Sequence, residues 1–167
     1  AAPQHGQVVV NIDGTFSYTP AQDYFGQDSF TYHLSNGVVD SNVSTVSLSI
    51  TPVNDAPVAA DISDPQTTMA EDSTLTIDLL AGANDAEGGH LVASIVSGPL
   101  HGSLVQGSDG TVTYTAEANY FGLDSFTYRV SDGEADSSLA SVSLTVTAVN
   151  DAPVASSAET DQRARLK

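Results

Sequence analysis

An internal repeat constrains the fold of this chain more than any other feature. Residues 5–59 match residues 101–155 without a gap, at an offset of 96 residues, and 31 of the 55 aligned positions are identical. A match of this length indicates two copies of one structural unit. The second copy is complete, whereas the first contains only the C-terminal part of the unit.

The repeat predicts the domain organisation. We expect an incomplete repeat over residues 1–53, a linker over 54–60, a complete repeat over 61–149, and a second linker with a disordered tail over 150–167. The first repeat has no counterpart of the segment from Glu71 to Ser97, so we expect it to lack two strands and to expose sheet edges. The sequence leaves open whether this repeat folds alone, docks on the complete repeat or pairs with another chain.

Short alternating runs predict an all-β fold. Val142, Leu144 and Val146 fall on one face of a strand over 141–147, and Phe126, Tyr128 and Val130 fall on one face of a strand over 125–130. Further strands are expected at 74–79, 91–96, 103–106 and 111–115. Turn residues separate these runs and no segment has a helical period, so we predict a Greek-key β-sandwich.

The balance of charge excludes several kinds of partner. The chain has 21 acidic residues and 4 basic residues, and no basic residue precedes Arg129. We therefore expect no nucleic acid binding, and no apolar run is long enough for membrane insertion. Acids without nearby cations repel one another, which favours a bound divalent cation. The alternative is that the acids lie on a solvated surface and only increase solubility.

The motifs of known catalytic sites are missing from the sequence. The chain has no Cys, no His-Glu-x-x-His motif and no Gly-x-Ser-x-Gly motif. Asp28 and Asp124 lie in the most similar motif of the repeat, and we expect them to cap a local turn beside Tyr-Phe-Gly rather than to act as general acids or bases. We therefore predict that the chain is not an enzyme.

The shared motifs resemble those of a known family. Both copies contain Asp-Gly-Thr, Tyr-Phe-Gly, Asp-Ser-Phe-Thr-Tyr and Val-Asn-Asp-Ala-Pro-Val-Ala, in the same order. This text resembles the tandem cadherin-like and bacterial immunoglobulin-like repeats of large bacterial surface adhesins, each about 95 residues long. The resemblance extends to about Ala155 and implies an immunoglobulin- or cadherin-like β-sandwich in a secreted or cell-surface protein.

The resemblance also implies calcium at the joints between repeats. Cadherins use a similar Asn-Asp linker before a Pro, and calcium prefers oxygen ligands. By analogy, the first joint would bring together Asn54, Asp55, Asp85, Glu87 and Asp132. The second joint would bring together Glu71, Asp72, Asn150 and Asp151. The match is imperfect at Glu87, where the family has Asp, and in the first repeat Asn36 occupies the place of Asp132.

A structure without metal is the main alternative at these positions. Asn-Asp-x-Pro forms turns by itself, and the acids can be turn residues on a solvated rim. We interpret the chain as a structural extender whose partners are the neighbouring repeats. The alternatives are a module that binds a cell-surface glycan or protein through Tyr24, Phe25, Tyr120 and Phe121, and homotypic adhesion through sheet edges.

Overall fold

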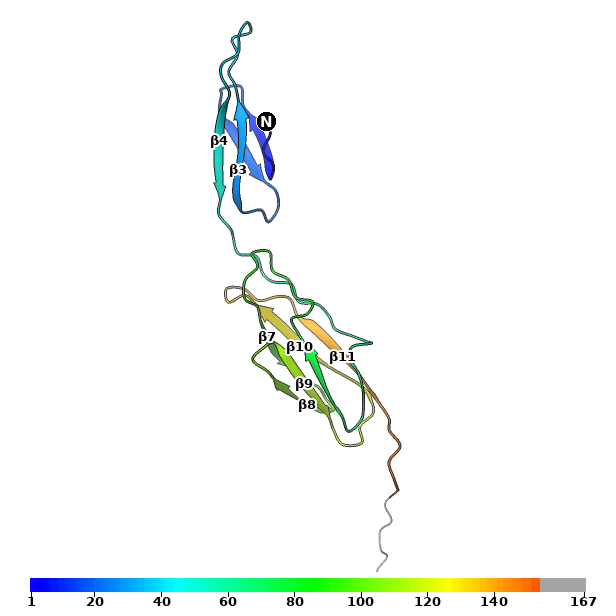
Figure 1. The fold of residues 1–167 in the computed structure, drawn as a ribbon. Helices are drawn as coiled ribbons and strands as arrows, with labels where there is room; N and C mark the ends of the chain where they lie inside the picture. Colours follow the sequence, from blue (N-terminus) through cyan, green and yellow to red (C-terminus); the bar gives the residue numbers. More distant parts are fainter. Residues whose placement is uncertain (154–167) are drawn as a thin grey trace, which may run out of the picture.

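A computed structural model describes residues 1–153, so the predicted disordered tail lies outside the described residues. The described range is all-β, with eleven strands and no helix. It contains no helix that is long and apolar enough to cross a membrane. Two groups of strands follow one another along the chain, the open unit (β1–β4) and the complete unit (β5–β11), and they lie end to end (Figure 1).

The complete unit is a sandwich of two sheets. The strands are β5 (Thr68–Ala70), β6 (Thr74–Asp78), β7 (Val92–Ser97), β8 (Gly102–Gln106), β9 (Thr111–Ala116), β10 (Gly122–Ser131) and β11 (Ala140–Thr147). One sheet has the order β5-β11-β10-β7 and the other has the order β6-β9-β8. Only β5 and β11 pair in parallel, within the described residues. This architecture confirms the predicted immunoglobulin- or cadherin-like sandwich.

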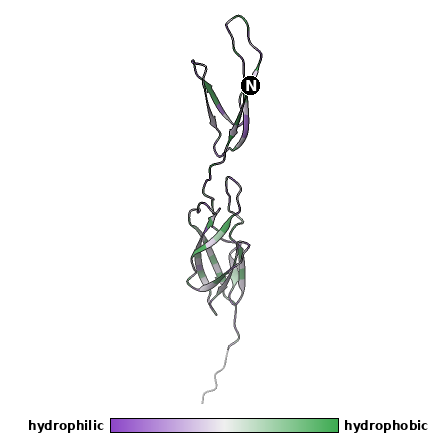
Figure 2. Ribbon diagram, turned by 90° about the vertical axis from the view of Figure 1, so that its left-hand side faces the viewer, coloured by the Kyte–Doolittle hydropathy of each residue, from purple (hydrophilic) through white to green (hydrophobic). Residues whose placement is uncertain are grey.

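Alternating apolar residues build the core between the two sheets. Val142, Leu144 and Val146 of β11 are at most 3% exposed, because every second side chain of a strand points to the same face. Phe126 and Tyr128 of β10 are each 1% exposed. Hydrophobic residues accordingly lie along the strands of the complete unit (Figure 2). The predicted inward faces of these two strands are therefore confirmed.

The open unit contains four of the corresponding strands. They are β1 (Gly6–Val10), β2 (Phe16–Pro20), β3 (Gly26–Tyr32) and β4 (Ser44–Ile50), which form the pairs β1-β2 and β3-β4. At the repeat offset these strands match β8, β9, the first part of β10, and β11. Strands β5, β6 and β7 have no counterpart within residues 1–53, whereas we predicted that two strands would be absent there.

The hydrophobic side chains of the open unit are poorly buried within residues 1–53. Tyr32 is 44% exposed, whereas the equivalent Tyr128 is 1% exposed. Phe16 is 43% exposed, whereas the equivalent Val112 is fully buried. Among the described hydrophobic side chains of this unit, only Phe30 reaches the burial of a core residue, at 4% exposed. The open unit therefore gains much less hydrophobic stabilisation than the complete unit.

Candidate functional site

The linker joins the complete unit along the loop that follows β6. The Val58 N–H donates to the Asn84 carbonyl at 2.7 Å, and the Asn84 N–H donates back to the Val58 carbonyl at 3.0 Å. Ile62 then runs parallel to Val142 of β11. These backbone contacts hold residues 54–57 close to the loop that contains Asp85 and Glu87.

Two further contacts join the linker to the end of the complete unit. The Asn54 side-chain amide donates to Asp132 Oδ2 at 2.9 Å, over a separation of 78 residues. The Asp55 backbone N–H donates to Glu87 Oε2 at 3.1 Å. The Glu at position 87, where the resembling family has Asp, is the side chain that reaches the linker here. Four of the five residues predicted for the first joint are therefore in contact as two pairs, Asn54 with Asp132 and Asp55 with Glu87.

Asp85, the fifth residue, has a carboxylate oxygen without a partner. Its Oδ1 accepts the backbone N–H groups of Glu87 and Gly89, at 3.1 and 3.2 Å. Its Oδ2 is buried and has no hydrogen-bond partner. A buried carboxylate oxygen without a donor is unfavourable unless a cation or water satisfies it. Asp85 Oδ2 is therefore the buried oxygen of this joint that is free to bind a cation.

Asp132 organises its own turn as well as contacting the linker. Its Oδ1 accepts the N–H groups of Ala135 and Glu134, each at 2.7 Å. These two hydrogen bonds, and then the Asn54 amide, hold the pKa of Asp132 below its usual value, so its carboxylate is ionised at neutral pH. In the open unit Asn36 builds the same turn through Oδ1. Residue 132 therefore does not need a charge to form its turn.

The first joint fits calcium by its donor chemistry, although its carboxylates do not form a closed cage. Carboxylate and amide oxygens together with backbone carbonyls are the ligands that calcium prefers. Among the described residues, however, no three Asp, Glu or His side chains are grouped closely enough to hold a metal ion. A bound cation would therefore require the side chains of the joint to reorient, and Asp85 Oδ2 is the buried oxygen of the joint that has no hydrogen bond to give up.

The second predicted site lies at the opposite end of the complete unit. Glu71, which is 6% exposed, accepts the Val149 backbone N–H on Oε1 at 2.6 Å. The Glu71 N–H donates to the Thr147 carbonyl at 2.9 Å. These bonds place Glu71 beside the start of the second linker, where Asn150 is exposed. Asp72 follows Glu71 in a left-handed backbone conformation (φ 59°), and Asp151, like Asn150, is exposed.

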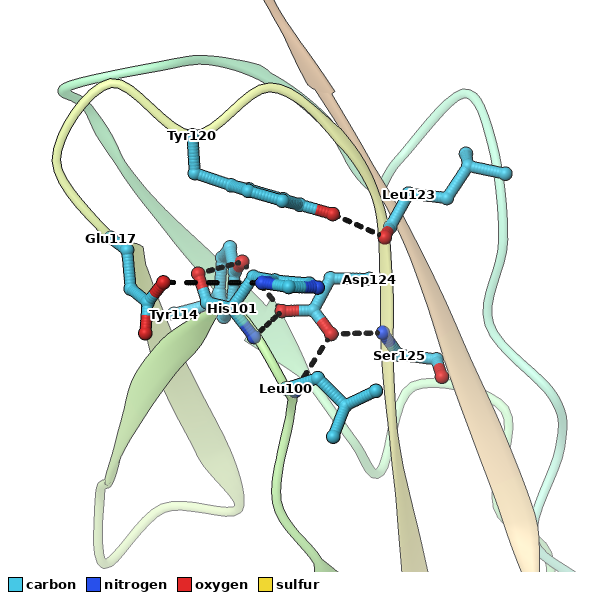
Figure 3. Close-up of polar contacts among 8 residues, drawn as sticks. All are labelled: Leu100, His101, Tyr114, Glu117, Tyr120, Leu123, Asp124 and Ser125. Atoms are coloured by element: carbon cyan, nitrogen blue, oxygen red, sulfur yellow. Dashed lines mark hydrogen bonds and ion pairs between the residues drawn. The ribbon is translucent and has the colours of Figure 1, made fainter.

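A separate polar cluster surrounds Asp124 near the start of β10 (Figure 3). Asp124 Oδ1 accepts the N–H groups of Leu100 and Ser125, at 2.9 and 2.8 Å. Its Oδ2 accepts the N–H of His101 and the Tyr114 hydroxyl, both at 2.9 Å. The carboxylate thus ties the turn between β7 and β8 to strands β9 and β10. We predicted a structural role for it, but the partners lie on a different turn from Tyr-Phe-Gly.

The cluster keeps Asp124 ionised and gives each of its carboxylate oxygens two hydrogen-bond donors. Burial by itself raises the pKa of this carboxyl, but the N–H groups of Leu100, His101 and Ser125 outweigh burial, so the pKa lies below its usual value. Burial and the bond to Asp124 raise the pKa of the Tyr114 hydroxyl. All four hydrogen bonds stabilise the charged form, which is the opposite of what a general acid needs.

The same cluster occurs in the open unit. Asp28 accepts the N–H groups of Gln4, His5 and Ser29 and the Tyr18 hydroxyl. Burial opposes the change, yet these donors lower the pKa of Asp28 to about 2. The tyrosine that donates to this carboxylate, Tyr18 or Tyr114, was not predicted from the sequence. The signal was available, because each copy has an identical Tyr ten residues before the Asp.

The aromatic residues proposed for ligand binding divide into two groups. Tyr120 stacks on His101, with ring centroids 4.2 Å apart, and Tyr24 stacks on His5 at the same distance. Both tyrosines are half-buried. Phe121 is 62% exposed, and its repeat equivalent in the open unit is 41% exposed. Only the phenylalanine of each pair thus presents a free aromatic face.

Comparisons with known proteins agree on the kind of domain. Residues 53–147 match the family model described as a cadherin-like domain. Residues 1–52 match the model described as a bacterial cadherin-like domain. A search of curated proteins found no match.

The solved structures that resemble this chain have low sequence identity, and the protocadherin, with a TM-score above 0.5, shows the same fold. Human mucin-like protocadherin EC1-2 is 15% identical, with a TM-score of 0.56, and the match covers 87% of this chain and 79% of that chain. The endo-fucoidan hydrolase MfFcnA4 from glycoside hydrolase family 107 is 23% identical, with a TM-score of 0.43, and the match covers 89% of this chain but only 23% of that chain. Yersinia pseudotuberculosis InvD is 18% identical, with a TM-score of 0.32, and the match covers 93% of this chain and 49% of that chain.

Cadherin-like domains are generally non-catalytic structural or adhesion modules, and bacterial ones are typical of extracellular or surface proteins. The family models together cover residues 1–147, and the sandwich described above is the fold that they imply. The chain therefore belongs to the cadherin-like domain family.

Proposed function

We propose that this chain is an extender segment of a secreted or cell-surface bacterial adhesin, in which calcium at the joints between repeats stiffens a stalk. The observation that carries the proposal is the buried, unpaired Oδ2 of Asp85 beside the linker. Membership of the cadherin-like family supports a structural or adhesion role. The neighbouring repeats of the same chain are the partners of each unit, with boundaries at residues 53/54 and 60/61.

The linker and the loops that it contacts explain why a cation would stiffen the joint. Glu87 and Asp132 contact the linker residues Asp55 and Asn54 at one end of the complete unit. Asp85 lies in the same loop as Glu87 and accepts its backbone N–H. Three carboxylates at one end of the unit repel one another, and among the described residues the Arg129 guanidinium contacts Asp136 at 3.9 Å rather than any of these three. Calcium would supply positive charge at this end. Asn54 and Asp55 would then be held to the loops more firmly than by two hydrogen bonds.

The second joint would work in the same way. Glu71 and Asp72 lie at the opposite end of the complete unit, and Asn150 and Asp151 begin the next linker. Each repeat would thus present acids at both ends, so that a series of repeats has a cation at every joint. Asn36 in place of Asp132 would make the joint at the far end of the open unit weaker.

Small-angle X-ray scattering of the full chain tests this stiffening. We expect a larger maximum dimension in about millimolar calcium, the range of weak extracellular sites, than in chelator. Asp85→Asn should remove the difference. Asp40→Asn is the matched control, because Asp40 is exposed in the loop between β3 and β4 and its carboxylate contacts only His33, at 3.8 Å, within the described residues. Equal dimensions of the unmodified chain in both solutions would contradict the calcium-stiffened joint.

Glycan binding is the alternative that a specific observation favours. Phe25 and Phe121 are exposed at equivalent positions of the two repeats, and exposed aromatic rings are common at ligand-binding surfaces. A glycan array with the unmodified chain and with the Phe121→Ser variant tests this alternative. Binding that the substitution abolishes would support it, and no binding by the unmodified chain would contradict it.

A further inference from the structure

The loop between β3 and β4 contains a reactive pair of residues. Asn36-Gly37 is the only Asn-Gly pair in the sequence, although the chain has seven Asn residues. Both residues are exposed, and Gly37 has a positive φ of 87°. Gly has no side chain to hinder the approach of its backbone nitrogen to a neighbouring group. The Asn36 side-chain amide is the group nearest in sequence that this nitrogen can attack.

Hydrogen bonds hold the Asn36 side-chain amide in the turn that contains the Gly37 nitrogen. Asn36 Oδ1 accepts the backbone N–H groups of Val38 and Val39, both at 3.0 Å. The ring closed by the bond to Val38 includes the Gly37 nitrogen. The Gly37 N–H itself donates to Ser35 Oγ at 3.3 Å, so its proton already has an acceptor. Nucleophile, carbonyl and proton acceptor are therefore held in one turn.

The two donors to Oδ1 are placed where negative charge develops. Attack on an amide carbon turns the carbonyl oxygen into an oxyanion, and preorganised N–H donors stabilise such a charge. The N–H groups of Val38 and Val39 donate to this oxygen before any reaction begins. The turn thus stabilises the intermediate for attack on Asn36, in addition to forming the connection between β3 and β4.

We propose that Asn36 is a self-modifying site that loses ammonia through attack by the Gly37 nitrogen. The Gly37 nitrogen forms a bond to Cγ of Asn36 and gives up its proton, and the side-chain nitrogen leaves as ammonia. The product is a five-membered succinimide. Water then opens the ring at either carbonyl, which gives Asp or isoaspartate at position 36. The net reaction consumes one water and releases one ammonia, with no oxidation or reduction.

The reaction can give position 36 of the open unit the same residue that the complete unit has at position 132. Position 36 corresponds to Asp132, whose Oδ1 makes the equivalent hydrogen bonds to the N–H groups of Glu134 and Ala135. Opening to Asp adds the carboxylate that the complete unit has. Opening to isoaspartate instead adds a methylene to the backbone of the turn, which should disturb the pairing of Ser35 with Asp40.

Time-resolved mass spectrometry of the full chain tests the proposal. The folded chain and the chain in urea are kept at mildly alkaline pH, and peptides are analysed by electron-transfer fragmentation, which separates Asp from isoaspartate. We expect a gain of one mass unit at Asn36 before any of the other six Asn residues. We also expect the folded chain to react at least as fast as the chain in urea, because unfolding removes the two donors.

Asn36→Gln is the matched variant, since its longer side chain would have to close a six-membered ring. This variant should keep its mass at position 36 under the same conditions. A folded chain that shows no gain at Asn36, or a slower gain than in urea, would overturn the proposal. The test does not involve calcium, so its outcome is independent of the proposed stiffening of the joints.

Discussion

The side-chain amide of Asn54 donates to the carboxylate of Asp132 at 2.9 Å, across 78 residues. This contact joins the linker to the loop that follows β10 in the complete unit. The other oxygen of Asp132 holds its own turn through Glu134 and Ala135. One carboxylate thus has two separable roles. Asn36 forms the same turn without a charge, which shows that the charge at position 132 is not needed for the turn.

Substitution of Asp132 by Asn should therefore separate the turn from the joint. We expect the free energy of unfolding in chelator to change little, because Asn forms the same turn at position 36. The rise in melting temperature on adding calcium should become smaller, because one anionic ligand is lost. Calorimetry of both proteins in both solutions measures these effects. A calcium response equal to that of the unmodified chain would show that Asp132 is only a turn residue.

Substitution of Asp124 by Asn should strongly destabilise the complete unit. The Asn amide can place only one oxygen where Asp124 has two, so buried N–H donors of the cluster lose their acceptor. Losing hydrogen bonds to a buried charge should cost about 3 kcal/mol. Urea unfolding followed by circular dichroism measures this loss.

Glu117→Gln is the control for the Asp124 substitution, because the Glu117 carboxylate lies 3.9 Å from His101 Nδ1 and its side chain is 65% exposed. We expect it to change stability by less than about 0.5 kcal/mol. A loss at Asp124 no larger than that of Glu117→Gln would show that the cluster is not structural.

The depressed carboxyl pKa values predict loss of stability in acid. The pKa of Asp28 is about 2, and hydrogen bonds also hold the pKa of Asp124 below its usual value, although burial opposes them. A carboxyl whose pKa is lower in the folded state contributes stability that is fully present above its unfolded pKa of about 4 and is lost as pH falls towards about 2. Melting temperatures measured between these two pH values should fall steadily.

The Asp124→Asn variant should show a shallower fall of melting temperature over this range, because one of the groups that takes up a proton is removed. Equal slopes for the variant and the unmodified chain would contradict the assignment of acid sensitivity to this cluster. The comparison uses slopes rather than absolute stability, so the lower stability of the variant does not obscure it.

The unequal burial of the two units predicts unequal protection of their backbone amides in hydrogen exchange. Strands β10 and β11 lie over a closed core, whereas β3 and β4 have an open face with Tyr32 44% exposed. Backbone amides of β10 and β11 should exchange only by global unfolding, and those of β3 and β4 should exchange by local opening at a lower free energy. Exchange followed by mass spectrometry measures both. Equal protection would show that another chain or segment covers the open face.

The sandwich could be predicted from the sequence because the pattern of each strand lies within a few consecutive residues. Strict alternation at Val142, Leu144 and Val146 places three side chains on one face whatever the rest of the chain does. Strand β5 (Thr68–Ala70) was missed for the opposite reason. It has only three residues, it pairs in parallel with β11, and no alternation can appear over so short a run.

The candidate site depended on contacts that no local pattern contains. The pairing of Asn54 with Asp132 joins residues 78 positions apart, and only the family resemblance suggested it. The structural role of Asp124 could be predicted, as an Asp that caps a local turn, but its place beside Tyr-Phe-Gly was wrong. Its partners Leu100 and His101 lie more than 20 residues away and donate through backbone N–H groups, which side-chain identity does not reveal.

Thermal melting in chelator and in about millimolar calcium tests the central claim most directly. A cation that binds only the folded state must raise the melting temperature by mass action. We predict a clear rise for the unmodified chain, and its loss when Asp85 and Asp151 are both replaced by Ala. The same melting temperature in both solutions would contradict calcium at the joints, and would leave a sandwich spacer whose acids are only a solvated surface.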